Sequence, residues 1–125
     1  MPVRHRQRLV FAVMTGLAEV EFVQVTTTTD SAAAANALAA SAVEARLAAS
    51  AQVVGPIYSY YWWEGAVEEA EEYQLVLKTA TDRYPALERH LREEHAYDEP
   101  EIICTAVVGG TRGYLDWLRA ETRPS

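Results

Sequence analysis

The chain has 125 residues, half of them hydrophobic, so it can form one folded domain with a core but not two. It carries 11 lysines and arginines against 18 aspartates and glutamates, which gives a net charge of -7. Such an acidic chain repels nucleic acid and anionic membranes and attracts cations. Cys104 is the only cysteine, which excludes an intrachain disulfide and a cysteine-based zinc site within one chain.

The beginning of the chain is expected to lie outside the folded domain. Arginines precede a short apolar run over 9–13, a pattern that loosely resembles a signal peptide. The run is too short to span a membrane. We therefore expect a non-core extension over 1–18, a domain over 19–122 and a tail over 123–125. The expected location is cytoplasmic, with export of the N-terminal segment as the open alternative.

The first strand and helix follow the extension. Apolar and polar residues alternate over 20–28, which predicts a strand. Asp30 or Ser31 can cap a helix that is predicted to run to about Ala49. Its many alanines favour helix and let it pack closely on a sheet. The expected apolar face of this helix is made of Ala35, Leu38, Ala42, Ala45 and Ala49.

A long β-hairpin is predicted over 53–79. Its first arm has five aromatic residues within the six positions 58–63, and residues 64–66 supply the turn. An arm of ten residues reaches ~33 Å, so the tip should project past the core and pair with another chain. The alternative is an aromatic core strand that lies flat in a monomer. On the return arm, Tyr73, Leu75 and Leu77 should point to one face.

The second half of the chain is expected to alternate again between helix and strand. The predicted elements are a helix capped by Thr81 or Asp82 with Pro85 in its first turn, a connector over 96–100, a strand over 101–108 and a helix capped by Thr111. The strand is largely apolar, which favours a central position in the sheet. The resulting order matches an α+β, ferredoxin-like fold: one antiparallel sheet with two helices on one face. The last helix is extra, and it can cover an edge or reach a neighbouring subunit.

Several segments, taken in series, resemble the CutA family of divalent-cation tolerance proteins over roughly residues 20–120. They are the end of the first strand leading into Asp30, Ala45–Ala49, Tyr60–Gly65, Glu72–Thr79, Arg83–Leu87, His95–Ile102 and Tyr114–Leu118. The resemblance implies a homotrimer of ferredoxin-like subunits that is formed through the hairpin strands. It also implies a role in the response to metal ions, without catalysis, and binding of copper or another divalent metal.

The metal site implied by the resemblance differs from the family pattern. Ser50 stands where family members commonly have a cysteine, and Thr26 where some bacterial members have one, so the thiol part of the proposed copper site is absent. His95 matches a proposed ligand position, and Glu94 precedes it. We expect weak to moderate, pH-sensitive binding of Cu(II) or another divalent metal, centred on His95 with carboxylate help from Glu94 and without a tight Cu(I) site. The alternative is that His95 only ends the second helix.

A second candidate site is a small-ligand cleft. By resemblance, Lys78, Tyr97, Glu101 and Trp117 gather at a polar cleft between subunits, although an ion pair with aromatic packing would explain them equally well. The first functional hypothesis is a metal-tolerance trimer, and the second is a PII-like signalling or scaffold trimer that binds a small ligand in this cleft. An enzyme that uses Glu101 or Lys78 as acid or base is the least supported, because no nucleophile with an adjacent base can be identified.

Overall fold

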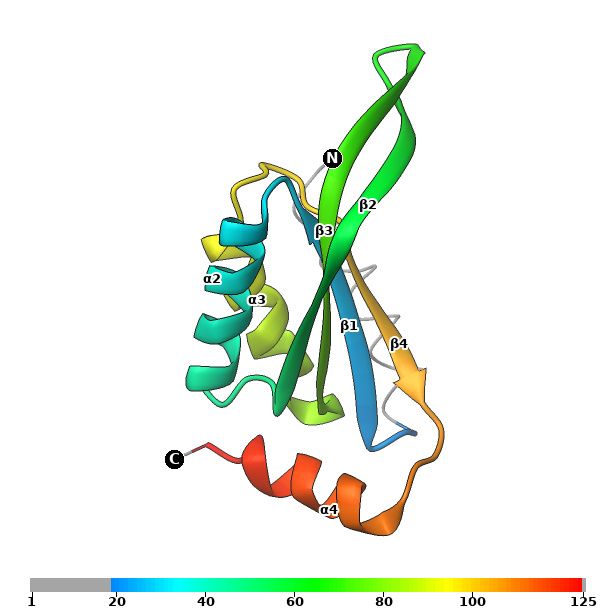
Figure 1. Ribbon diagram of the computed structural model, residues 1–125. Coiled ribbons are helices and arrows are strands. Elements are labelled where there is room, and N and C mark those ends of the chain that lie inside the picture. The colour runs from blue at the N-terminus through cyan, green and yellow to red at the C-terminus, as the bar shows by residue number, and fades with distance from the viewer. Residues whose placement is uncertain (1–18, 125) are drawn as a thin grey trace.

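The computed structural model describes residues 19–124, so the predicted extension over 1–18 lies outside the described residues. The elements in chain order are β1 (Phe22–Thr29), α2 (Ala32–Glu44), β2 (Ser50–Trp63), β3 (Ala66–Ala80), a 3-10 turn η1 (Thr81–Arg83), α3 (Tyr84–Glu94), β4 (Ile102–Val107) and α4 (Arg112–Glu121). The sheet has the order β2-β3-β1-β4, and neighbouring strands are antiparallel. Helices α2 and α3 cover one face, while α4 lies across the end of the sheet (Figure 1). The predicted ferredoxin-like fold with an extra helix is confirmed.

The core lies between this sheet face and the two helices. Alternate residues of the central strands point into it, so that Val25 on β1 and its partner Leu77 on β3 are both fully buried. Their neighbours Val23 and Leu75 are buried in the same way. The helices contribute three alanines and one leucine from α2 and two leucines from α3, namely Ala35, Leu38, Ala39, Ala42, Leu87 and Leu91.

Helix α2 is shorter than predicted. It begins at the N-cap Ser31, whose Oγ accepts the Ala34 N–H at 3.1 Å, but it ends at Glu44 rather than near Ala49. The chain leaves the helix through Arg46, whose φ of 63° is left-handed, and Ala45 is exposed. Leu47 is nevertheless buried, because it packs against the core from the connector to β2. The apolar residues after Arg46 are therefore buried in the connector to β2, although their spacing resembles that of a helix.

The predicted cap of the next helix is wrong. The chain enters α3 through η1, Arg83 occupies the N-cap position in helical conformation, and neither Thr81 nor Asp82 provides a side-chain cap. Pro85 does lie in the first turn, as predicted. The Asp82 carboxylate instead pairs with Arg119 of α4. Thr111 is the N-cap residue of α4, as predicted, although its side chain makes no capping hydrogen bond among the described residues.

Strand β4 lies at an edge of the sheet, so the predicted central position is wrong. It pairs with β1, and β1 and β3 are the central strands. The strand is apolar for a reason other than a central position: one of its faces packs on the core, and the other lies on the uncovered face of the sheet. Ile102 and Cys104 pack against the core, whereas Ile103 is 49% exposed on the face that α2 and α3 do not cover.

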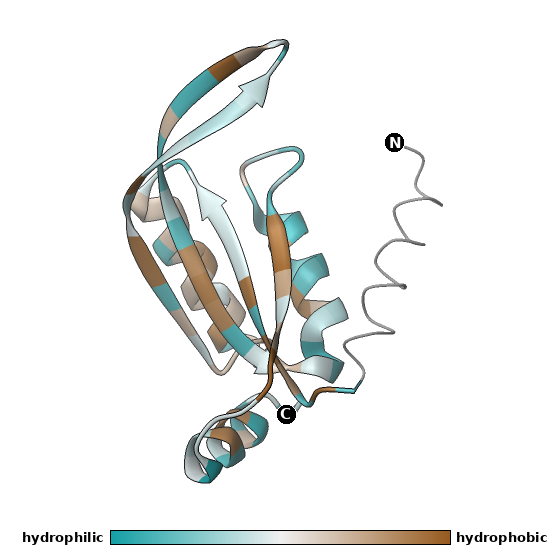
Figure 2. Cartoon of the chain, turned by 90° about the vertical axis from the view of Figure 1, so that its right-hand side faces the viewer, coloured by the Kyte–Doolittle hydropathy of each residue, from teal (hydrophilic) through white to brown (hydrophobic). Residues whose placement is uncertain are grey.

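The long hairpin is confirmed. Strands β2 and β3 pair from Ser50↔Lys78 to Trp63↔Ala66, and the turn consists of Glu64 and Gly65, which both have positive φ. The register shifts between Val54 and Ile57, which marks a bulge. Since β1 ends opposite Tyr73, the rest of the hairpin projects beyond the sheet (Figures 1 and 2).

Candidate functional site

The projecting end of the hairpin carries an exposed aromatic surface, which we call the aromatic hairpin (residues 58–71). Three tyrosines on β2 stand opposite glutamates of β3 through the pairs Tyr58↔Glu71, Tyr60↔Glu69 and Tyr61↔Glu68, whereas the two tryptophans stand opposite Val67 and Ala66. Trp62 is the most uncovered of these aromatic residues, exposed by 76%, and Tyr58, Tyr60 and Trp63 are each exposed by 60% or more. An uncovered aromatic surface of this kind is typical of a site that binds another protein chain.

A second uncovered surface is the sheet face opposite α2 and α3, which we call the open sheet face. Near one end, α4 covers it by packing Leu118 against Phe22 and Ala80. Farther along, Val54 and Ile103 are exposed by 46% and 49%. Apolar residues on a sheet face without a helix layer indicate that a further layer can pack there.

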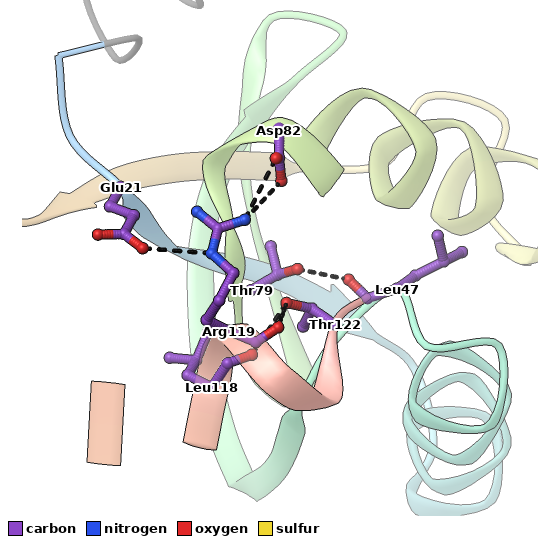
Figure 3. Close-up of polar contacts among 7 residues, drawn as sticks. All are labelled: Glu21, Leu47, Thr79, Asp82, Leu118, Arg119 and Thr122. Carbon is purple, nitrogen blue, oxygen red and sulfur yellow. Dashed lines mark hydrogen bonds and ion pairs between the residues drawn. The ribbon is translucent and has the colours of Figure 1, made fainter. Parts of the chain in front are cut away.

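Helix α4 is attached by polar contacts around its last turns (Figure 3). Arg119 is central: Nε donates to Glu21 at 3.2 Å, Nη1 donates to Asp82 at 3.2 Å, and the guanidinium lies 5.4 Å from the centre of the Phe22 ring. Arg46 forms a further ion pair with Glu121. No local sequence pattern indicates these partners, which are 37 to 98 residues apart along the chain.

The four residues of the predicted ligand cleft lie in two separate places within one chain. Lys78 pairs across the sheet with Gln24, whereas Glu101 precedes Ile102, which pairs with Thr27. These positions differ by about 10–13 Å along the strands. Tyr97 lies with Glu101 at the end of the sheet from which the hairpin projects, and Trp117 lies on α4 at the opposite end.

The surroundings of these four side chains also differ. The Tyr97 hydroxyl donates to Glu72 at 2.9 Å, and burial together with this bond raises the pKa of Tyr97. The Lys78 ammonium lies 3.3 Å from Gln52 Oε1. Trp117 is 42% exposed and its ring lies 5.5 Å from that of Tyr114, while Glu101 is exposed. One chain therefore does not form a closed cleft from this set.

His95 is held by hydrogen bonds on both ring nitrogens. Nε2 lies 2.8 Å from the Thr28 carbonyl oxygen and 3.2 Å from Thr27 Oγ1, and Nδ1 accepts the backbone N–H of Tyr97 at 3.0 Å. Because a carbonyl can only accept, Nε2 carries the proton and Nδ1 uses its lone pair. Burial is the main cause that lowers the pKa of His95 below its ordinary 6.5. The ring thus joins the end of α3 to β1.

The fit of the chain to a resident metal ion is poor. In residues 19–124, no three His, Cys, Asp or Glu side chains form a group that could hold a metal ion. Glu94 is exposed beside His95, whose only lone pair accepts the Tyr97 N–H. A metal ion can reach this ring nitrogen only if that bond breaks. Cys104 offers no ready thiolate, because burial raises its pKa to about 11.

Sequence reasoning missed a second histidine contact, on the outer side of the helix layer. Ser41 on α2 donates its hydroxyl proton to the Leu38 carbonyl at 3.0 Å, so its oxygen accepts from His90 Nε2 of α3 at 2.8 Å. His90 therefore joins the two helices and is not simply a surface residue. No local pattern could have indicated this pair, since 49 residues separate its members.

Membrane insertion through a helix has no support in the described part of the chain. No helix between residues 19 and 124 is long and apolar enough to cross a bilayer.

Comparison with known proteins gives a consistent result. The family model described as CutA1 divalent ion tolerance protein matches residues 23–121. The divalent-cation tolerance protein CutA of Pectobacterium atrosepticum is 42% identical over 91 residues, which cover 73% of this chain and 83% of that protein. The chloroplastic protein CutA 1 of rice is also 42% identical, over 88 residues, and there the match spans 70% of this chain but only half of the rice protein.

The solved structures agree with the sequence comparisons. The crystal structure of CutA1 from Oryza sativa aligns with a TM-score of 0.82 and 39% identity, covering 85% of this chain and 97% of that one. The similarity therefore includes the hairpin, the sheet and all three helices.

Proposed function

Because the chain belongs to the CutA1 family of divalent ion tolerance proteins, we propose that it acts in the response to divalent metal ions as a non-enzymatic homotrimer. The observation that carries the proposal is the exposure of the aromatic hairpin, whose two tryptophans are uncovered in the single chain. A monomer that kept these side chains in water would be prone to aggregate. Residues 19–122 are the unit that assembles, and a cytoplasmic location suits a chain with one cysteine.

Closed assembly explains two uncovered surfaces at once. The sheet has two edge strands, β2 and β4, and its open face exposes Val54 and Ile103. Edge strands with free backbone groups favour pairing with another chain. A cyclic arrangement of copies covers every such edge, whereas an open arrangement leaves one free at each end. Three copies are the number that the family resemblance implies.

The assembly can be tested by shortening the hairpin. Ile57 and Glu72 are cross-strand partners, so residues 58–71 can be replaced by Asn-Gly, a dipeptide that closes a two-residue turn. We expect a trimer mass for the wild type by light scattering and a monomer mass for this variant, with unchanged circular dichroism of the helices. In the matched control, Glu64→Asn places the same Asn-Gly turn, with the existing Gly65, on the full-length hairpin, and the trimer should remain. A monomeric wild type at micromolar concentration would refute the proposal.

We further propose that a divalent cation binds weakly at Glu94 and His95, with water or a second copy supplying the other ligands. An imidazole and a carboxylate suit Cu(II), Ni(II) or Zn(II). The cation has to compete with the Tyr97 N–H for Nδ1, so the binding should be weak. It should weaken further as the pH falls, because a protonated imidazole is no ligand.

Calorimetric titration tests the cation site. We expect Cu(II) to bind the wild type at neutral pH and to bind His95→Gln at least about tenfold more weakly. His90→Gln is the matched histidine control: His90 stands one helical turn before Glu94, but its Nε2 is bonded to Ser41, and this variant should bind Cu(II) as the wild type does. Equal affinity in the wild type and in His95→Gln would remove His95 from the site.

A PII-like trimer that binds a small ligand is the second candidate function. It is favoured by the separation of Lys78 and Trp117 from Tyr97 and Glu101, since residues at opposite ends of one chain can form one cleft between two copies. A thermal-shift screen against metals, nucleotides and small organic acids distinguishes the two functions. Stabilisation by a nucleotide or an acid, but by no metal, would favour the ligand-binding trimer.

A further inference from the structure

Lys78 is the only lysine of the chain, and the other ten of its 11 basic residues are arginines. It is half-buried in β3, on the open sheet face. Lysine differs from arginine in presenting a compact ammonium with three donors on a flexible stem, whereas a guanidinium is broad and planar. A lysine at this position therefore suits a partner that can accept hydrogen bonds from a compact positive charge.

The strand register puts Lys78 in a polar row across the sheet. Ser50 of β2 and Gln24 of β1 are its direct cross-strand partners, and Thr105 of β4 is the partner of Gln24. Side chains of directly opposed residues point to the same face, with Cβ atoms about 4.5–5.5 Å apart. We call these four residues the Lys78 row. It lies between Phe22 and other apolar residues on one side and Val76 and Ile103 on the other.

The hydrogen-bonding capacity of this row is only partly used. The Lys78 ammonium donates to the neutral Gln52 Oε1 at 3.3 Å, and none of the ion pairs formed within residues 19–124 includes Lys78. The Ser50 hydroxyl oxygen is buried and, unlike the Lys78 ammonium, has no hydrogen-bond partner in the described part of the chain. A buried hydroxyl without a hydrogen-bond partner destabilises the folded state, so a bound group that accepts its proton would be stabilising.

We propose that the Lys78 row binds an oxyanion, a carboxylate or a phosphate, through the Lys78 ammonium and the Ser50 hydroxyl. The inference rests on the proposed assembly, because a second copy on the open sheet face would remove Lys78 from water, and a charge out of water needs an opposite charge. The Gln24 and Gln52 amides flank the ammonium and can donate as well. The oxyanion comes either from a small free ligand or from a carboxylate of the second copy.

The single lysine makes a specific experiment possible. Reductive methylation with ¹³C-formaldehyde gives one side-chain signal in NMR spectra, that of Lys78, and a second signal from the α-amine of the expressed chain. Titration with acetate and with inorganic phosphate should shift the Lys78 signal in a saturable way, while the α-amine signal changes linearly. Ser50→Ala should weaken the saturable binding by about tenfold, since a hydrogen bond to an anion is lost. Ser41→Ala, on α2 at the opposite face of the sheet, is the matched control and should leave it unchanged.

The rate of methylation distinguishes the two sources of the oxyanion. If Lys78 resists methylation in the assembled protein but reacts in the shortened-hairpin variant, the oxyanion is a carboxylate of the second copy. If Lys78 reacts readily in the assembled protein and neither anion gives a saturable shift, the inference is overturned. Light scattering on the same samples tests the trimer separately from the anion site. A monomer that still binds acetate or phosphate saturably would refute the trimer but support the anion site.

Discussion

At the scale of single residues, His95 makes the stability of the protein depend on pH. Burial lowers its folded-state pKa below 6.5, although the Thr28 carbonyl and the charges of Asp30 and Glu72 act in the opposite direction. The unfolded chain then binds a proton more readily than the folded one, so the contribution of His95 is complete above about pH 6.5. It is lost progressively as the pH falls from there towards the folded-state pKa.

Urea unfolding at several pH values between 7.5 and 5, at one fixed chain concentration, measures this effect. The free energy of unfolding of the wild type should fall more steeply with decreasing pH than that of His95→Gln, whose amide can keep hydrogen bonds without titrating. Parallel pH curves for the two proteins would contradict a neutral, buried His95.

Gly55 is a second residue whose side chain matters, here through its absence. A Cβ at this position would lie 2.6 Å from Cδ2 of Tyr73, which packs against the core. We expect Gly55→Ala to lower the free energy of unfolding by about 1–3 kcal/mol, as in other overpacked sites. Gly109→Ala is the control, because a Cβ there meets nothing within 4 Å, and it should change stability by less than about 1 kcal/mol. Equal stability of the two variants would contradict the close approach.

At the scale of elements, α4 depends on one buried side chain. Leu118 is 1% exposed and packs against Phe22, Ala49 and Ala80, which belong to three different parts of the chain. Leu118→Ala should reduce the free energy of unfolding by about 2–5 kcal/mol in urea titrations. Asp116→Ala, on the exposed side of the same helix, should stay within about 0.5 kcal/mol of the wild type. A small loss for Leu118→Ala would mean that α4 is attached mainly by Arg119 and Arg46.

The elements also differ in how well the sequence predicted them. The hairpin was predicted because its signals are local: aromatic density, alternation, and Gly65 at a position with positive φ. The edge position of β4 could not be predicted, because an apolar run does not reveal which strands lie beside it in the sheet. The end of α2 was missed because Leu47 is buried outside the helix, so its apolar character extended the helical pattern.

The candidate sites show the same difference between what local sequence indicates and what only the fold determines. Sequence resemblance named the residues of the cleft and of the cation site, but it contained no information on their hydrogen bonds. The two bonds that occupy His95 join residues 2 and 67 positions apart, and only the fold brings the distant one together. The Lys78 row likewise depends on strand register, which combines residues of four strands.

At the scale of the whole molecule, assembly should make thermal stability depend on concentration. If three copies fold as one unit, raising the chain concentration favours the folded state by mass action. We expect the midpoint of thermal unfolding, followed by circular dichroism, to rise over a hundredfold increase in wild-type concentration. The midpoint of the shortened-hairpin variant should stay constant over the same range. A wild-type midpoint that does not respond would contradict a folded state that includes more than one copy.

The attachment of α4 also has a consequence for biosynthesis. Phe22 begins the first strand, yet it is covered by Leu118, near the end of the chain, and β1 lies between β3 and β4, which are translated much later. As long as α4 is still in the ribosomal exit tunnel, the emerging chain lacks the helix that covers this end of the sheet. The subunit therefore cannot complete its tertiary structure until α4 has emerged, so that synthesis through α4 precedes the closing of the end of the sheet where synthesis began.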